Sequence, residues 1–199
     1  MDLSRVSDHD PVPLCSAGRE AAVLVPVIDS GVDPALVFTK RAEYLEEHPG
    51  QMSFPGGGVE PFDRDLTATA LREAHEEIGL VRSEAAVLGR LDCIQTVTQY
   101  AICPVVATVP DRTYRPDERE VAEIVHLSIE ALTDPANYES EARDHPVEGE
   151  IRLHYFRVNG YTVWGATARM LVQFLELVTD WTVPETPDRQ VDPDADFPV

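Results

Sequence analysis

The segment LTATALREAHEEIG, residues 66–79, constrains the fold most, because both of its ends carry helix signals. Asp65 is a suitable N-cap residue and Gly79 a suitable stop. At roughly 100° per residue, the two sides of this helix differ in character. One side is mainly apolar, with Thr67, Leu71, Ala74 and Ile78, and the other carries the small Thr69 and Ala70 followed by Glu73, Glu76 and Glu77. We expect the apolar stripe to pack on a sheet and the carboxylates to face outward.

Strand-like stretches surround this helix. They are two strands joined by a Gly/Asp turn in 21–41, strands in 85–98, 101–110 and 121–128, and an Asn-Gly hairpin in 151–165. A second amphipathic helix is expected at 166–181. This alternation predicts an α/β (α+β) fold with a central mixed sheet between helices. Residues 1–18 should be an arm of low order, 19–181 the folded domain, and 182–199 a disordered acidic, Pro/Asp-rich tail.

The charge of the chain is extreme. Its formal net charge is -20, and Lys40 is its only lysine. Such a surface resembles proteins of halophiles, in which strong salt screens self-repulsion. The alternative is an ordinary acidic protein whose tail supplies part of the excess. No basic stripe is present to neutralise phosphates, so nucleic acid is not an expected partner. The chain has no membrane-length apolar run and no signal-like start, which predicts a cytoplasmic protein without a membrane partner.

The cysteines predict neither a zinc site nor a disulfide. The chain has three cysteines, Cys15, Cys93 and Cys103, which is an odd number, and no two of them have CxxC spacing. Cys93 and Cys103 stand in apolar, strand-like stretches, where buried and unreactive thiols are the expected outcome.

Three glutamates within little more than one helical turn repel one another. A solvated helix face would account for an arbitrary acidic triplet. However, no lysine or arginine follows Glu76 or Glu77 at i+4, and the helix is entered from a loop, 42–65, that is rich in Gly and Pro. Its FPGGG stretch can turn tightly and bring carbonyl oxygens near a ligand. Clustered hard oxygen ligands suit Mg²⁺ or Mn²⁺.

The stretch GGGVEPFDRDLTATALREAHEEIGL resembles the Nudix box, G-x5-E-x7-R-E-U-x-E-E-x-G-U, where U is aliphatic. The resemblance implies an α/β/α sandwich that hydrolyses a nucleoside diphosphate linked to another moiety. It implies divalent-metal binding by Glu73, Glu76, Glu77 and a carbonyl of the glycine turn, best assigned to Gly56. It also implies that Arg72 orients the glutamates.

The first half of the box departs from this pattern. Arg64 stands where the box has its first glutamate, with Asp63 one position before it and Asp65 one after. A loop longer by one residue would let Asp63 take the place of the missing carboxylate.

The loop before the helix narrows the resemblance to coenzyme A pyrophosphatases. Their extra motif is matched in register by Thr39, Arg41, Ala42, Gly50, Phe54, Pro55, Gly56 and Gly57. Similar segments follow at 120–132 and 154–171. The resemblance implies substrate binding by Arg41, His48, Gly50, Phe54 and Gly57. The motif's second arginine is replaced by Glu46, which places an anion where the motif has a cation.

The reaction implied for coenzyme A gives 3',5'-ADP and 4'-phosphopantetheine. Glu120 is the first candidate for the general base or an extra metal ligand, and Glu118 and Glu123 are alternatives. Other hypotheses are a Nudix enzyme for ADP-ribose, dinucleoside polyphosphates or modified nucleotides, a non-catalytic Nudix-fold nucleotide-binding module, and an acidic structural protein. A homodimer is compatible with the sequence.

Overall fold

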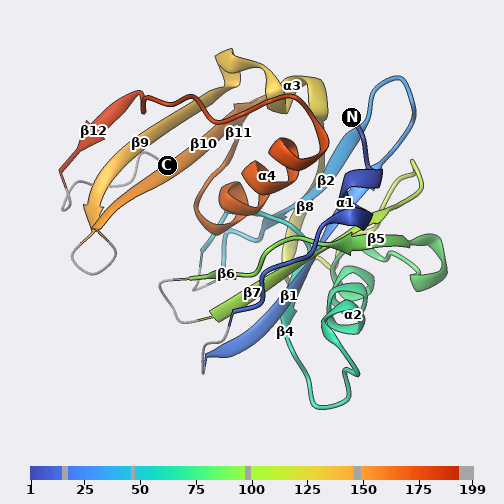
Figure 1. Ribbon diagram of the computed structural model, residues 1–199. Helices are drawn as coiled ribbons and strands as arrows, with labels where there is room; N and C mark the ends of the chain where they lie inside the picture. The colour runs from blue at the N-terminus through green and yellow to red at the C-terminus, as the bar shows by residue number, and fades with distance from the viewer. Residues whose placement is uncertain (15–17, 46–47, 97–99, 146–148, 193–199) are drawn as a thin grey trace.

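The computed structural model describes residues 1–14, 18–45, 48–96, 100–145 and 149–192. It contains two sheets with helices packed on them (Figure 1). The strands of the larger sheet are β1 (Arg19–Ile28), β2 (Ala35–Arg41), β3 (Met52–Ser53), β4 (Gly56–Gly58), β5 (Ala86–Arg90), β6 (Ile94–Gln95), β7 (Tyr100–Thr108) and β8 (Val121–Ser128). The strands of the smaller sheet are β9 (Tyr138–His145), β10 (Gly149–Val158), β11 (Tyr161–Val163) and β12 (Arg189–Val191). The helices are α1 (Ser4–Asp8), α2 (Leu66–Ile78), α3 (Ile129–Thr133) and α4 (Gly165–Val178).

The larger sheet is mixed, as the sequence predicts. Its two central strands, β1 and β7, run parallel, and β2, β4 and β8 join it antiparallel. Strand β1 is buried on both faces, because its alternate residues enter two separate clusters. Ala22 and Leu24 pack with α2, whereas Val23 and Val25 pack with α4. The sheet therefore lies between α2 and α4, which lie on opposite sides of β1 in Figure 1, and this confirms the predicted fold class.

Helix α2 has both predicted ends. The Asp65 side chain accepts a hydrogen bond from the Ala68 N–H, and Gly79 adopts the left-handed conformation that closes the helix. The prediction that all three glutamates face outward is wrong for Glu77, which is buried. Thr69 and Ala70 are also fully buried, so they do not leave open space beside the carboxylates.

The Gly/Pro-rich loop is more regular than the sequence suggests. Residues 52–53 and 56–58 form the short strands β3 and β4, which pair with β2 and β1. The glycines therefore form a strand edge and not a tight turn. A Cβ on Gly56 would lie 2.5 Å from the Cα of Val23, so only glycine allows this pairing.

Both terminal segments fold onto the domain. The expected arm of low order contains α1, whose Val6 is fully buried, and the Asp2 N–H donates to the carbonyl of Val178. The expected disordered tail contains β12, which pairs parallel with β9. The rest of the tail, 193–199, lies outside the described residues.

Cys93 and Cys103 form a disulfide, which corrects the prediction of free thiols. The antiparallel pairing of β6 with β7 places Ile94 opposite Ile102, so the next residue pair outward is Cys93 and Cys103. Their Cα atoms lie 4.2 Å apart. Odd cysteine number and absent CxxC spacing do not reveal a cross-strand pair, because that contact depends on the strand register.

The helices of the described segments include none that is both long and apolar enough to cross a membrane.

Candidate active site

Arg72 is the centre of the candidate site. Its guanidinium donates to the carboxylates of Asp63, Glu73 and Glu76 at N–O distances of 3.0, 2.8 and 3.1 Å. It also donates to the carbonyl oxygen of Gly58 at 3.0 Å. A planar guanidinium with five donors suits this number of acceptors. Arg72 therefore fixes the glutamates of α2 relative to the edge of β4.

Asp63 anchors Arg72 and does not face solvent. Only 4 % of its side chain is exposed. Its carboxylate also accepts the Thr69 hydroxyl and the Glu60 N–H, both at 2.9 Å. The hydrogen bonds from Arg72, first among these effects, lower the pKa of Asp63 to about 2. Asp63, the acid one position before the box's first glutamate position, therefore affects the site by holding Arg72.

Glu73 is half-buried against the glycine strand. A Cβ on Gly57 would lie 2.5 Å from Glu73 Oε1, so glycine at this position leaves the room that the carboxylate occupies. Burial, the largest effect, raises the pKa of Glu73, and the hydrogen bond from Arg72 opposes it. The sequence motif places Gly57 at the substrate, whereas the structure places it against Glu73.

Glu77 is a buried carboxyl group with few hydrogen-bond partners. It is 7 % exposed, and among the described residues its Oε2 atom makes no hydrogen bond. Burial raises its pKa to about 8, with further contributions from the negative charges of Glu73 and Glu120. The N–H of Gly56 and the positive charge of Arg41 act in the opposite direction, but their effects are smaller. At neutral pH such a group is mainly protonated in the metal-free protein, and a bound cation would favour its charged form.

The edge of β4 faces these carboxylates. Pro55 and Val59 are each bonded to β1, because the Pro55 carbonyl accepts the Leu24 N–H and the Val59 N–H donates to the Glu20 carbonyl. In an antiparallel ladder bonded and non-bonded positions alternate, so Gly56 and Gly58 direct their N–H and C=O groups away from β1. Gly56 follows this rule, because its N–H reaches Glu77. Its carbonyl belongs to the same outward edge.

This donor set fits a divalent cation. Carboxylates and a backbone carbonyl are the hard oxygen ligands that Mg²⁺ and similar ions take, and the orphaned Glu77 oxygen lies among them. Within the described ranges, no three acidic, histidine or cysteine side chains already converge as a metal cluster. Arg72 pairs with Oε1 of Glu73 and with Oε2 of Glu76, and a carboxylate in such a pair can bind a cation through its second oxygen.

Glu120 belongs to the same region and its two alternatives are less suitable. Glu120 is exposed, and its charge contributes to the raised pKa of both Glu73 and Glu77. Glu123 instead accepts the Tyr161 hydroxyl at 2.7 Å. Glu118 is not among the main charges that shift the pKa of Glu73 or Glu77. The electrostatics therefore favour Glu120 as the acid nearest the glutamates of α2.

The residues of the coenzyme A motif separate into different environments. Arg41 is the last residue of β2, and its positive charge lowers the pKa of Glu77. His48 is exposed with φ 53°, and Gly50 has φ 69° beside Glu43, so both shape the loop before β3. Phe54 is 2 % exposed and stacks on Phe38 at a centroid distance of 4.7 Å. The prediction that Phe54 contacts substrate is wrong, because its ring belongs to the core. Glu46 lies outside the described residues.

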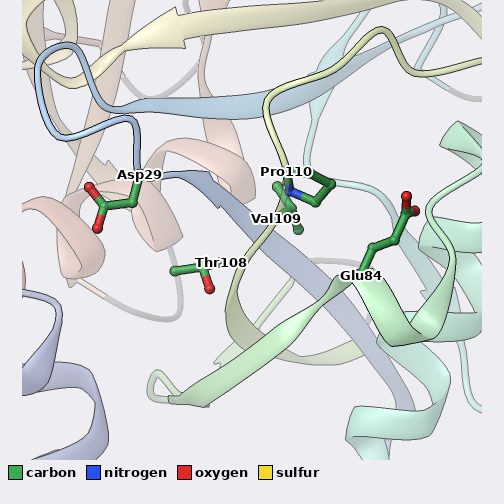
Figure 2. Close-up of a pocket in the computed structure, with 5 residues that line it drawn as sticks. All are labelled: Asp29, Glu84, Thr108, Val109 and Pro110. Atoms are coloured by element: carbon green, nitrogen blue, oxygen red, sulfur yellow. The ribbon is translucent and has the colours of Figure 1, made fainter.

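A hollow lies at the other end of the sheet. It has a volume of about 550 Å³ and is lined by Asp29, Glu84, Thr108, Val109 and Pro110 (Figure 2). The carboxylates of Asp29 and Glu84 point away from each other there. The α2 glutamates and the glycine strand do not line it, so this hollow is separate from the candidate site.

Two contacts of the site are not evident in the sequence motifs. The Phe62 ring lies over Arg72, with 5.7 Å from the guanidinium carbon to the ring centroid. Tyr44 bonds to the segment that carries Glu120. Their only sequence signal is an aromatic residue in a polar loop, which does not identify a partner.

Comparison with known proteins assigns the chain to a class of hydrolases that act on pyrophosphate bonds. The NUDIX domain model matches residues 18–148. This match covers more than half of the chain, and the chain belongs to the Nudix family. Members of this family generally use divalent metal ions and act on small nucleotide substrates.

Curated relatives agree with this assignment. The uncharacterized Nudix hydrolase NudL of Enterobacter sp. (strain 638) is 38% identical over 159 residues, covering 77% of this chain and 79% of the relative. NudL of Yersinia enterocolitica is 32% identical, covering 88% and 91%. Among solved structures, the Nudix hydrolase RenU of M. Smegmatis is 24% identical, covers 58% of this chain and 74% of that chain, and has a TM-score of 0.47. The C. elegans Ap4A hydrolase is 16% identical, covers 56% and 81%, and has a TM-score of 0.47.

Proposed function

We propose that this Nudix hydrolase cleaves the diphosphate of coenzyme A into 3',5'-ADP and 4'-phosphopantetheine, in the cytoplasm and with Mg²⁺ or Mn²⁺. The observation that carries the proposal is the segment 36–57, in which eight residues match the coenzyme A pyrophosphatase motif in register. The segment leads directly into β4, beside the carboxylates of α2.

Glu73, Glu76, Glu77 and the Gly56 carbonyl would hold the metal. A bound divalent cation would neutralise charge on the diphosphate and make the attacking water more acidic. Arg72 keeps the glutamates in place through its bonds to Asp63 and Gly58. Glu120 would take the proton of the attacking water as general base, because it is the exposed acid electrostatically nearest to this set. Arg41 and His48 remain candidates for binding the anionic groups of the substrate.

A second candidate substrate class follows from Glu46. An anion in place of the motif's second arginine disfavours an additional phosphate on the substrate. This favours substrates that lack an additional phosphate outside the diphosphate, such as ADP-ribose. The same site residues would hydrolyse them.

The test is a substrate panel in high KCl with Mg²⁺ or Mn²⁺. Coenzyme A, ADP-ribose and diadenosine polyphosphates are compared at equal concentration, and the products are identified by mass. We expect the highest kcat/KM for coenzyme A. Cleavage of ADP-ribose with coenzyme A left intact would reject the proposal and select the second candidate.

The same assay tests the site. Glu76→Gln should reduce turnover by at least about 100-fold, in the range typical of lost electrostatic stabilisation, without a change in the circular dichroism spectrum. Glu150→Gln is the matched control, because Glu150 is an exposed acid on β10 in the other sheet. Full activity of Glu76→Gln would refute the assignment of the site to α2.

A further inference from the structure

Tyr44 has an unusual environment for an exposed aromatic residue. It follows β2 and is 69% exposed. Its hydroxyl nevertheless has two consecutive carbonyl oxygens, those of Glu118 and Arg119, at O–O distances of 2.8 and 2.7 Å, and they share its single proton. These residues lie 74 and 75 positions further along the chain. One hydroxyl therefore joins the connection after β2 to the connection before β8.

The carbonyls that Tyr44 binds come directly before Glu120. The Glu120 N–H donates to the Asp117 carbonyl at 2.9 Å, and the Glu120 carbonyl accepts the Ala42 N–H at 2.9 Å. Thus the backbone of Glu120 is held by two bonds of its own, and the Tyr44 hydroxyl holds the two residues before it. Ala42 and Tyr44 approach this segment from the same connection.

The carboxylate of Glu120 depends on that backbone for its position. Its side chain is exposed and long, and a free rotamer population would spread the carboxylate over several positions. The negative charge of Glu120 nevertheless contributes to the raised pKa of Glu73 and of the buried Glu77. A general base must lie within hydrogen-bond reach of the proton that it removes, so small displacements of its backbone affect the reaction.

We propose that Tyr44 is a positioning residue for Glu120. Its hydroxyl fixes the segment 118–120 so that the Glu120 carboxylate reaches the water that attacks the diphosphate. This inference rests on the proposed function, in which Glu120 is the general base. It assigns to Tyr44 no contact with the substrate.

The first test is Tyr44→Phe, which keeps the ring and removes the hydroxyl. We expect kcat to fall by about 5- to 10-fold, as for the loss of one hydrogen bond, and KM to remain unchanged. The matched control is Tyr161→Phe, which removes a hydroxyl bond to Glu123 further along the same segment and should leave kcat unchanged. A higher KM with unchanged kcat in Tyr44→Phe would mean that the hydroxyl binds substrate, which overturns the inference.

The second test is the double variant with Glu120→Gln. If Tyr44 acts only through Glu120, the double variant should be as slow as Glu120→Gln alone. If the two residues act independently, the fold losses of kcat in the single variants should multiply in the double variant. If Glu120→Gln is slow and Tyr44→Phe is fully active, the positioning role is wrong and the proposed base stands. If Glu120→Gln is fully active, the proposed base is wrong and the role of Tyr44 falls with it.

The third test does not require turnover. In the metal-free protein, hydrogen exchange of the amides of residues 119–121 should be faster in Tyr44→Phe than in the wild type, because the hydroxyl holds that segment. Exchange elsewhere in β8 should be unchanged. Equal exchange rates in the two proteins would show that the hydroxyl does not fix the segment and would overturn the inference.

Discussion

At the scale of single residues, Glu77 has the least favourable electrostatics in the site. It is buried, one of its oxygens lacks a hydrogen bond in the described structure, and two other carboxylates act on it. Proteins retain such groups where function requires them, because burial without compensation reduces stability. A helical wheel places Glu77 opposite the apolar stripe, so the sequence predicts exposure. Its burial results from β4, whose position follows from pairing with β1 and not from the helix itself.

This burial predicts a pH-dependent cost in the metal-free protein. The pKa of Glu77 is about 8 in the folded state, above its unfolded value of about 4.5. Between these values the folded state binds more protons than the unfolded state, so the contribution of Glu77 to stability falls as pH rises from about 4.5 to about 8. Glu77→Gln should therefore raise the melting temperature of the metal-free protein at pH 8 by several degrees, and much less at pH 5.

The measurement is thermal unfolding of both proteins with a chelator present, followed by circular dichroism. Glu150→Gln controls for the loss of one negative charge at an exposed position. Equal melting temperatures of wild type and Glu77→Gln at pH 8 would contradict the buried position of this carboxylate. Adding Mg²⁺ should stabilise the wild type more than Glu77→Gln.

At the scale of elements, the sequence predicts those that local signals define. Helix α2 has its cap and its stop, the Asn159-Gly160 turn joins β10 to β11, and the central strands are apolar runs. The glutamates of the acidic helix are evident from their spacing, but their role as metal ligands is implied by the resemblance to the Nudix box and not by the spacing. The short strands β3 and β4 could not be predicted, because β3 has only two residues, β4 consists of glycine, which has low strand propensity, and only pairing with β2 and β1 makes them strands. The core position of Phe54 has the same origin.

The sequence does not predict the disulfide that joins β6 to β7, and the presence of this disulfide can be tested. Reducing Cys93–Cys103 should destabilise the fold by about 2–3 kcal/mol, the range for a loop of this length. We expect dithiothreitol to lower the melting temperature of the wild type. Without dithiothreitol, a Cys93→Ala/Cys103→Ala variant should have a melting temperature that is lower by the same amount. Alkylation of the denatured, unreduced protein should label one thiol per chain. Three labelled thiols would show that the disulfide is absent.

At the scale of the whole molecule, charge dominates. A chain with net charge -20 repels itself, and the repulsion opposes folding at low ionic strength. Its surface ion pairs, such as Arg119 with Asp117 and Lys40 with Glu43, are local and exposed. Pairs of this kind contribute little to stability, and they do not remove the net charge.

We propose on this basis that the protein is adapted to strong salt. Raising KCl from about 0.1 M to about 2 M shortens the Debye length from about 10 Å to a few ångströms, so the melting temperature should rise markedly. Sucrose at the same osmolality serves as control, because it stabilises folded proteins by exclusion without screening charge, and the rise in melting temperature with KCl should exceed the rise with sucrose. A melting temperature that is indifferent to KCl would refute the adaptation while leaving the assignment of the active site intact.

The pairing of β12 with β9 affects how the molecule can be handled. The last described strand runs parallel to β9 and is held by Asp188, whose carboxylate accepts the Ser140 N–H at 2.8 Å. It covers backbone donors and acceptors that would otherwise form an open edge, and open edges invite chains to pair with one another. A truncated chain that ends before Asp188 would expose this edge, and affinity tags are therefore better placed where they leave 188–191 undisturbed.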